Sequence, residues 1–326
     1  GDGAGSFNPQ TTYAVGSSQA FVAVEDFNAD SNLDLAVVQS IPGNSIVSIL
    51  PGDGSGSFNS QTTYSVGYYP QVIAVEDFNV DGNLDLVVLV SSAAGDNISI
   101  FLGGGSGSFG PETTYAVGSG LTAVAVEDFN GDTIPDLALT NQSSSSVSIV
   151  LGDGFGSFGA EATYAVGSTP RSVAAEDFNG DGQLDLAVAN QDSNNVSVLL
   201  GDGSGGFNPQ TTYAVDSGPR SVAVEDFNAD GNKDLVTANS FSGNVSILLG
   251  DGSGGFNPQT TYAVGSFPTS VAVEDFNGDG QLDLAVTNFG GNSVSILLNT
   301  PGVSITPGTT PTEAGPVNGT FNITLD

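Results

Sequence analysis

The sequence predicts an all-β fold, a six-bladed β-propeller of four-stranded antiparallel blades that is closed by the N-terminal strand and followed by a short C-terminal β-tail. Three observations carry this prediction. The peptide Glu-Asp-Phe-Asn occurs six times, at steps of 51, 51, 49, 49 and 49 residues. Each step holds four short stretches in which apolar and polar residues alternate, as they do in half-buried strands. No stretch has the period of an amphipathic helix.

The four stretches of a unit follow one another in a fixed order. They read Thr-Thr-Tyr-Ala-Val, Val-Ala-Val-Glu, Leu-Asp-Leu-Ala-Val and Val-Ser-Ile-Leu, and clusters of Gly, Asn, Asp and Ser separate them. β-Branched residues favour strands, and the small polar clusters favour turns. Because one unit cannot bury both faces of its sheet, units of this length are expected to stack around a common axis as propeller blades.

The order of the strands also predicts how the ring closes. Residues 11–15 match the last strand of a unit, whereas the sixth unit stops after its third strand, near residues 294–298. We therefore expect the N-terminal stretch to complete the last blade, with Tyr13 beside residues 293–298, because this pairing removes two exposed strand edges. A seven-bladed ring that has lost one unit is the alternative.

The repeat breaks at residue 299, so residues 1–299 are predicted to form the propeller and residues 300–326 a separate tail. The tail opens with a linker rich in Pro and Thr. Its two alternating stretches, 303–306 and 320–325, weakly resemble the opening strands of an Ig-like or Calx-β-like module. They either begin such a module or provide a strand that is exchanged with another molecule.

Glycine-rich turns precede the last strand of each unit. A turn such as residues 201–207, Gly-Asp-Gly-Ser-Gly-Gly-Phe, resembles a phosphate-binding loop, but that loop needs a Lys after its second Gly and a following helix, whereas the chain has a single Lys elsewhere and no predicted helix. We interpret these segments as turns that a repeated aromatic residue anchors in the core. The anchors are Phe7, Phe58, Phe109, Phe158, Phe207 and Phe256.

The charge of the chain excludes several kinds of partner and site. Three basic residues stand against 36 acidic ones, for a formal charge of -33, so nucleic acid and anionic membrane surfaces would repel the chain. The chain contains no Cys and no His, which excludes disulfides, thiol catalysis, Ser-His-Asp triads and the usual zinc sites. No apolar run is long enough to cross a bilayer. Any metal must be bound by oxygen atoms.

An oxygen-rich loop lies between the first and second strands of each unit. In the second unit it reads Asp-Phe-Asn-Val-Asp-Gly-Asn-Leu-Asp, with side-chain oxygens at Asp77, Asn79, Asp81 and Asp85. A tight curl directs these oxygens and the position-7 carbonyl inward, and Gly82 at position 6 permits the bend. Hard oxygen donors in a flexible arrangement select Ca²⁺. The sequence predicts about six calcium ions, one for each blade.

The predicted metal ligands are, unit by unit, Asp26, Asn28, Asp30, Asn32 and Asp34; Asp77, Asn79, Asp81, Asn83 and Asp85; Asp128, Asn130, Asp132, Ile134 and Asp136; Asp177, Asn179, Asp181, Gln183 and Asp185; Asp226, Asn228, Asp230, Asn232 and Asp234; Asp275, Asn277, Asp279, Gln281 and Asp283. An Asx-rich turn that caps its own backbone is the alternative interpretation. Without cations, however, half of the acidic residues would repel one another in tight loops.

The loops are not identical. The third loop has Thr133 at position 6, where the other loops have Gly or, in the first loop, Ser31, and Pro135 at position 8, where they have Leu or, in the fifth loop, Lys233. A positive φ would strain the β-branched Thr133. We expect the third site to be the weakest or the most distorted.

The repeated Asp-x-Asn-x-Asp-Gly-x-x-Asp loop resembles FG-GAP and VCBS-type repeats, a family known from integrin α-chain propellers and from secreted bacterial proteins. The resemblance covers residues 1 to about 299 and implies Ca²⁺ between the first two strands of each blade. The Phe-Gly and Gly-Ala-Pro signatures are absent, so the integrin ligand preference does not carry over.

The turns on the opposite face vary from unit to unit. In an antiparallel blade the calcium loops and the glycine-rich turns leave by one face, and the remaining turns by the other. The varying turns hold most of the aromatic residues that do not follow the repeat, and both Arg residues. Such side chains contribute strongly to binding. The candidate partner-binding residues are Tyr68, Tyr69, Arg171, Arg220, Phe241, Phe267 and Phe289, with drift in unconstrained loops as the alternative explanation.

The sequence favours a secreted, non-enzymatic, calcium-binding propeller that serves as an adhesive or assembly module. One form of such a module is the repeating subunit of an extracellular filament. Calcium-dependent loops and an acidic surface favour an extracellular or cell-surface location. A protein partner or self-association is expected. A carbohydrate-binding, lectin-like propeller is one alternative, and the propeller domain of a polysaccharide-degrading enzyme is another, which the lack of His and the single Lys disfavour.

Overall fold

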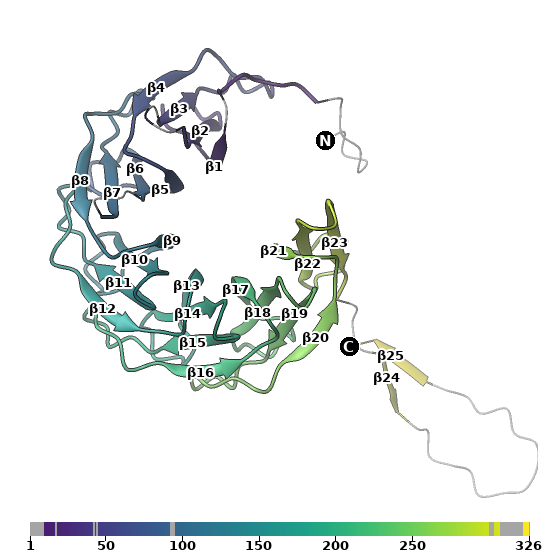
Figure 1. The fold of residues 1–326 in the computed structure, drawn as a ribbon. Coiled ribbons are helices and arrows are strands. Elements are labelled where there is room, and N and C mark those ends of the chain that lie inside the picture. Colours follow the sequence, from purple (N-terminus) through teal and green to yellow (C-terminus); the bar gives the residue numbers. More distant parts are fainter. Residues whose placement is uncertain are drawn as a thin grey trace, which may run out of the picture.

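The computed structural model of the chain describes residues 10–16, 18–41, 43, 45–91, 95–299, 303–306 and 322–325. Six antiparallel sheets stand around a common axis like the blades of a propeller (Figure 1). Consecutive strands form each sheet, four strands in blades 1 to 5 and three in blade 6. The predicted all-β propeller of six blades is confirmed. Within the described ranges no helix is long and apolar enough to cross a membrane.

The strands occupy the same four places in each blade. The innermost strands are β1 (Gln19–Glu25), β5 (Pro70–Glu76), β9 (Leu121–Glu127), β13 (Pro170–Glu176), β17 (Pro219–Glu225) and β21 (Pro268–Glu274). The second strands are β2 (Asp34–Gln39), β6 (Asp85–Val90), β10 (Asp136–Asn141), β14 (Asp185–Asn190), β18 (Asp234–Asn239) and β22 (Asp283–Asn288). The third strands are β3 (Ile46–Leu50), β7 (Asn97–Phe101), β11 (Ser146–Val150), β15 (Asn195–Leu199), β19 (Asn244–Leu248) and β23 (Ser293–Leu297). The outermost strands are β4 (Thr62–Ser65), β8 (Thr113–Ala116), β12 (Ala162–Ala165), β16 (Thr211–Ala214) and β20 (Thr260–Ala263).

The core lies between neighbouring blades. The second strands are apolar on both faces, and every residue of β14 is buried. Five hydrophobic clusters fill the five interfaces, and each cluster takes residues from two successive blades. Complete burial of one such Val, Leu or Ile side chain stabilises the fold by about 1.5–3 kcal/mol. A blade is therefore stable through its neighbours.

A repeated set of aromatic contacts joins each blade to the next. Phe129, in the loop between β9 and β10, packs edge-on against Phe207 of blade 4 with ring centroids 5.7 Å apart, and Tyr164 of β12 contacts the same ring at 5.6 Å. The N–H of Gly205 donates to the carbonyl oxygen of Phe129 at 3.1 Å. The same ring contacts recur between the other interior blades. The predicted anchoring role of the turn phenylalanines is confirmed there, while Phe7 lies outside the described residues.

One detail of the predicted closure is wrong. Blade 6 has three strands, residues 10–16 form no strand, and Tyr13 does not lie beside residues 293–298. Tyr13 contacts Phe58 of blade 1 instead, with ring centroids 5.3 Å apart, and its hydroxyl accepts the Phe58 N–H at 3.2 Å. Tyr64 makes the same contact with Phe109 of blade 2. The contact with the following blade therefore holds Tyr13, and a gap separates blade 1 from blade 6 (Figure 1).

The two strand candidates of the tail pair with each other. β24 (Val303–Thr306) and β25 (Asn322–Leu325) form an antiparallel pair with Val303 opposite Leu325. This pairing does not show whether the tail begins a further module or provides an exchanged strand. The predicted boundary between propeller and tail at residue 299 stays a prediction.

Candidate functional site

The loop between the first and second strands of each blade curls around its own first carboxylate. In blade 2, one carboxylate oxygen of Asp77 accepts the N–H of Asp81 at 3.0 Å, and the other accepts the N–H of Gly82 at 2.7 Å. Val80 and Gly82 have φ angles of 56° and 87°. Positions 4 and 6 are left-handed in all six loops, so the curl requires this conformation twice, once more than the sequence indicated.

The third loop adopts the same curl as the others. Thr133 has φ of 68°, which confirms the expected positive value, and its N–H donates to Asp128 at 2.6 Å. A β-branched residue in this region is strained. The strain is therefore present at the third loop, while the weaker affinity of that loop for a metal stays a prediction.

The third and fifth side chains gather with the first at the exposed end of the loop. One oxygen of Asp81 accepts the N–H of Asn83 at 2.8 Å, and the other accepts the side-chain amide of Asn79 at 3.0 Å. The amide oxygen of Asn79 accepts the N–H of Asp81 at 3.0 Å. The N–H of Asn83 is the main reason that the pKa of Asp81 lies below its ordinary value. Charged carboxylates are thus stabilised at this end.

The ninth side chain faces the sheet. Asp85 is fully buried, and its carboxylate accepts the N–H of Phe78 at 3.0 Å and the N–H of Gly103, in the glycine-rich turn, at 2.6 Å. This carboxylate links two turns of the same blade through backbone hydrogen bonds. The same pair of bonds occurs at Asp34, Asp85, Asp136, Asp185 and Asp234, and at Asp283 the N–H of Asn299 takes the place of the glycine N–H.

Burial raises the pKa of four of these ninth carboxyl groups, those of Asp85, Asp136, Asp185 and Asp234. Desolvation raises the pKa of Asp85, Asp136 and Asp185 to about 6, although the backbone N–H groups act in the opposite direction. The negative charges of Asp81 and Asp77 raise the pKa of Asp85 further. In these four loops negative charge lies close to a desolvated carboxyl group, and a bound cation would relieve the resulting repulsion.

The side-chain donors at positions 1, 3 and 5 fit a hard cation. Side-chain oxygens at positions 1, 3 and 5 share the exposed end of the loop, and carboxylate and amide oxygens are the ligands that Ca²⁺ takes in proteins. In the described part of the chain no three acidic side chains lie close enough together to hold a metal. The position-9 carboxylate does not join the side chains of positions 1, 3 and 5, because both of its oxygens accept backbone N–H groups.

The aromatic candidates of the variable face are exposed. Phe289 is 77% exposed, and Phe241 and Phe267 pack edge-on with ring centroids 6.2 Å apart. Tyr68 and Tyr69 are exposed between blades 1 and 2. The structure thus divides the predicted aromatic residues into two groups, one beside blade 2 and one at blades 5 and 6.

Two of these aromatic residues are held in a strained backbone conformation. The residue before each innermost strand is left-handed, and this position holds Tyr69 with φ of 48° and Phe267 with φ of 53°. Two other blades have Gly120 and Gly218 at the same position. A bulky residue in this conformation costs roughly 1–3 kcal/mol relative to an unstrained one. Packing at this position therefore does not require an aromatic residue.

The two Arg residues lie apart from the aromatic groups and line a cavity of about 290 Å³. Its other lining residues are Gln71, Thr122 and Thr269, and all five occupy the second position of an innermost strand. Sequence analysis missed these three partners, although alignment of the repeats would have placed them in register with the Arg residues.

Neither Arg residue forms an ion pair with a described carboxylate, although the charge of Asp192 acts on Arg171. Arg171 donates to the side-chain oxygens of Gln191 at 2.6 Å and Gln142 at 3.0 Å. Burial, and next the positive charge of Arg220, lower the pKa of Arg171. The ion pair of the described chain joins Lys233 and Glu176 at 3.3 Å. The cavity is thus a positive region in an acidic protein.

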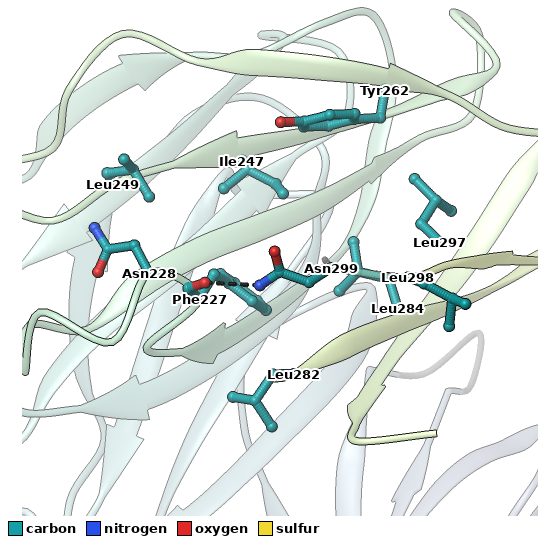
Figure 2. A pocket seen from close by; sticks show the side chains of 10 residues that line it. All are labelled: Phe227, Asn228, Ile247, Leu249, Tyr262, Leu282, Leu284, Leu297, Leu298 and Asn299. Atoms are coloured by element: carbon teal, nitrogen blue, oxygen red, sulfur yellow. Dashed lines mark hydrogen bonds between the residues drawn. The ribbon is translucent and has the colours of Figure 1, made fainter. Parts of the chain in front are cut away.

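A second cavity, of about 410 Å³, lies between blades 5 and 6 (Figure 2). Phe227 and Tyr262 belong to blade 5, and Leu282 and Leu297 to blade 6. The side-chain amide of Asn299 donates to the carbonyl oxygen of Phe227 at 2.8 Å. The lining is mainly apolar, and the cavity is at the point where the chain leaves the last blade.

Known protein structures share this fold at low sequence identity. A protein from Lactobacillus plantarum is 14% identical with a TM-score of 0.62, and the match covers 86% of this chain and 84% of that one. A catalytically inactive virginiamycin B lyase from Staphylococcus aureus is 16% identical with a TM-score of 0.56, over 86% and 84% of the two chains. The Dos1 propeller is 14% identical with a TM-score of 0.55, over 84% and 66%. These likenesses concern the fold alone.

The repeats themselves match a family model. The model described as FG-GAP-like repeat matches residues 26–88, 77–139, 128–188, 177–237 and 226–286, each span running from one oxygen-rich loop past the next. No curated protein is similar enough to count as a relative. The matched spans cover most of the propeller and place the oxygen-rich loops at the same point of every repeat. The chain therefore belongs to the FG-GAP-like repeat family.

Proposed function

We propose that the chain is a secreted, non-enzymatic, calcium-binding propeller that acts as an adhesive or assembly module. The observation that carries the proposal is the recurrence of one curled, oxygen-rich loop at the same edge of all six blades. Each loop collects the oxygens of positions 1, 3 and 5 at its exposed end. Calcium concentrations outside cells are high enough to fill loops of modest affinity, which supports an extracellular location.

Calcium would stabilise the loops by neutralising their charge. The groups that would hold the ion in each loop are the carboxylates of positions 1, 5 and 9, the position-3 amide oxygen and the position-7 carbonyl. The ion supplies charge neutralisation and no chemistry. A ligand that binds the folded state alone stabilises it by about 2.7 kcal/mol for each site at 100 times its dissociation constant. Removal of six ions should therefore have a large effect.

Metal analysis of the purified chain tests the calcium part of this proposal. We expect about six Ca²⁺ ions for each chain, and a chelator should lower the thermal midpoint strongly. Asp132→Asn should remove one ion. The matched control is Asp153→Asn, which removes the same charge from the glycine-rich turn of the same blade and should retain all ions. A chain that binds no calcium and melts at the same temperature with chelator would contradict the proposal.

The adhesive part rests on the exposed aromatic residues of the variable face. Aromatic side chains provide a large contact area at a small entropic cost, and they dominate binding energy at protein interfaces. At Tyr69 and Phe267 the fold tolerates a strained aromatic residue where other blades have Gly. Contact with a partner would account for this choice at Tyr69 and, together with the ring contact to Phe241, at Phe267.

Adhesion of chain-coated beads to intact cell surfaces tests this part. Combined replacement of Tyr68, Tyr69 and Phe267 by Ser should abolish adhesion without a change in calcium content. Phe155→Ser is the matched control, because Phe155 is 82% exposed on the calcium-loop face. Equal adhesion by the triple variant and the control would show that the aromatic residues do not form the contact.

Carbohydrate binding is the second candidate function, and the Arg-lined cavity favours it. Gln71, Thr122 and Thr269 offer hydrogen-bonding groups for hydroxyls, and two guanidinium groups that form no ion pair with a described carboxylate suit the carboxylate of a ligand. An acidic sugar such as glucuronate combines both features. Calorimetry should show glucuronate binding that Arg220→Gln weakens about tenfold, whereas Lys233→Gln, which removes the same charge elsewhere, should not. Equal binding of glucose and glucuronate would exclude this candidate.

A further inference from the structure

An Asn occupies position 3 of all six oxygen-rich loops, and the residue that follows it divides the loops into two groups. Loops 1, 2 and 5 have Ala29, Val80 and Ala229 at position 4, whereas loops 3, 4 and 6 have Gly. The Asn residues of the three Asn-Gly pairs are Asn130, Asn179 and Asn277. One position of one repeated loop thus offers three Asn-Gly pairs and three matched pairs without Gly.

An Asn-Gly pair can lose its side-chain amide without an enzyme. The backbone nitrogen of Gly attacks Cγ of Asn, and the new C–N bond closes a succinimide ring. The bond from Cγ to the side-chain nitrogen breaks, and that nitrogen leaves as ammonia with the proton of the Gly N–H. Water then opens the ring at either carbonyl, which gives Asp or isoaspartate. A Cβ on the following residue hinders the attack, so Gly is the residue that favours it.

Packing does not demand Gly at position 4 of these loops. Apart from its chain neighbours, an added Cβ at Gly131, Gly180 or Gly278 would have no heavy atom within 4 Å. Ala29 and Ala229 adopt the same left-handed conformation, with φ of 58° and 59°. An exchange between Gly and Ala at position 4 should therefore preserve the curl, which makes the two groups of loops comparable.

The curl restrains both of the groups that react. In loop 3 the N–H of Gly131 donates to the carboxylate of Asp128 at 2.8 Å. Asp132 fixes the side chain of Asn130, because its N–H donates to Oδ1 at 2.8 Å and its carboxylate accepts from Nδ2 at 3.0 Å. The equivalent Gly N–H bonds of loops 4 and 6 are both 2.7 Å long. Attack on Cγ needs a free Gly nitrogen and a rotated Asn side chain, so the loop must open first.

The following blade holds an interior loop closed, and the loop of blade 6 has no such cover. The N–H of Gly205 donates to the carbonyl oxygen of Phe129 at 3.1 Å, directly before the Asn-Gly pair of loop 3. Gly254 donates to Phe178 of loop 4 at 3.0 Å. A gap follows blade 6 (Figure 1), and Phe276 is 47% exposed, whereas its equivalents Phe129 and Phe178 are at most 4% exposed. Segments with fewer contacts open more often.

We propose that Asn130, Asn179 and Asn277 are sites of spontaneous deamidation, that opening of the curl controls the rate, and that Asn277 reacts first. Water is the co-reactant, and ammonia is released. An Asp at position 3 lacks the amide donor for position 5 and adds a negative charge beside the carboxylates of positions 1 and 5. Isoaspartate lengthens the backbone inside the curl by one carbon atom. The modification therefore changes the charge and shape of these loops as the chain ages, and it goes beyond the function proposed above.

Mass spectrometry of each position-3 Asn in the full-length chain tests the proposal. The folded chain is kept in chelator at neutral pH, and chymotryptic peptides are analysed over time for the mass difference between an amide and an acid. We expect Asn277 to convert about tenfold faster than the two interior Asn-Gly pairs. The position-3 Asn residues of loops 1, 2 and 5 should remain amides. The Asn-Gly pair at residues 318–319 lies outside the described residues and is scored separately.

Exchanges at position 4 provide matched controls. Gly278→Ala gives loop 6 the residue that loops 1 and 5 have at this place, and it should slow the conversion of Asn277 about tenfold. Ala229→Gly should make Asn228 reactive. Asp128→Ala removes the acceptor of the Gly131 N–H, so it should speed conversion in loop 3 about tenfold and leave loop 4 unchanged.

Urea separates the effect of the fold from the effect of sequence. All three pairs lie in the same tetrapeptide, Phe-Asn-Gly-Asp, so they should convert at equal rates in the unfolded chain. Equal rates in the folded chain, or folded rates that match those in urea, would overturn the proposal. So would a folded chain in which Asn277 stays an amide, or in which Asn28 converts as fast as Asn277. Because the experiment is carried out in chelator, its result does not depend on the calcium proposal.

Discussion

Interior blades and blade 6 have the same sequence pattern and differ in their neighbours. Val245 of β19 is fully buried, and Val294 at the same position of β23 is 60% exposed. Phe227 is 8% exposed, and Phe276, its equivalent in the last loop, is 47% exposed. Burial in this fold is therefore a property of the interface between two blades, and a repeat at the end of the arc keeps its strands without gaining that burial.

Removal of the position-9 carboxylate should destabilise an interior blade much more than blade 6, and we expect this to be the largest difference between them. Asp185→Ala leaves the N–H groups of Phe178 and Gly201 without acceptors, at a cost of about 1–3 kcal/mol for each buried group. Asp283→Ala should cost less, because Phe276 is half exposed and water reaches its N–H. Urea denaturation in chelator, where calcium does not contribute, measures both costs. Equal costs would show that the anchor acts within a blade alone.

Replacement of equivalent isoleucines in blades 3 and 6 by Ala should give the next largest difference in stability. Ile149→Ala should destabilise the chain by about 2–5 kcal/mol, because Ile149 is 1% exposed and its removal leaves a cavity. Ile296→Ala should change the stability of dilute monomer by no more than about 0.5 kcal/mol. The urea midpoint at low protein concentration measures the effect. A large loss at Ile296 would mean that blade 6 is already covered in the monomer.

Phe267→Gly should have a smaller effect and should stabilise the chain, by about 1 kcal/mol. Gly218, one blade earlier, has the same left-handed conformation without a Cβ, so the substitution should relieve strain at Phe267. Thermal unfolding of the variant should move to a higher or equal midpoint while adhesion of coated beads falls. Gly218→Phe is the reciprocal variant and should lower the midpoint.

A change of pH should have the smallest effect on the stability of the chain. Asp85, Asp136 and Asp185 have pKa values raised to about 6 from 3.8, so their contribution to stability is fully present below about pH 3.8 and is lost as pH rises through about 6. Carboxylates with lowered pKa values, such as Asp81 and Asp275, act in the opposite sense below about pH 3.8. In chelator the thermal midpoint should rise from pH 7 to pH 5 and fall below pH 4.

Added calcium provides the control for the pH experiment. A bound cation favours the charged carboxylates, so the midpoint in calcium should fall as pH decreases from 7 to 5. The same pH profile with and without calcium would contradict both the raised pKa values and the metal site.

Most of the fold and part of the candidate site were predictable from sequence. The spacing of Glu-Asp-Phe-Asn gave the number of blades, and the alternation of apolar residues gave the strands. The curl around Asp77 followed from the loop pattern, whereas the left-handed Val80 did not, because Val disfavours that conformation; the Gly at position 4 of three other loops was the available signal. The second role of Asp85, as a link to the Gly103 turn, also escaped, since the two residues are 18 positions apart.

The sequence by itself determined the repeating unit, because strands, turns and the oxygen-rich loop depend on residues that are near one another in the chain. Only the tertiary structure determined the separation between blade 1 and blade 6 and the exposure of Val294, whose equivalent Val245 is buried. It also determined that Arg171 and Arg220 line the same cavity. These features depend on the angle between neighbouring blades. That angle results from many packing contacts across each interface, and no short stretch of sequence encodes it.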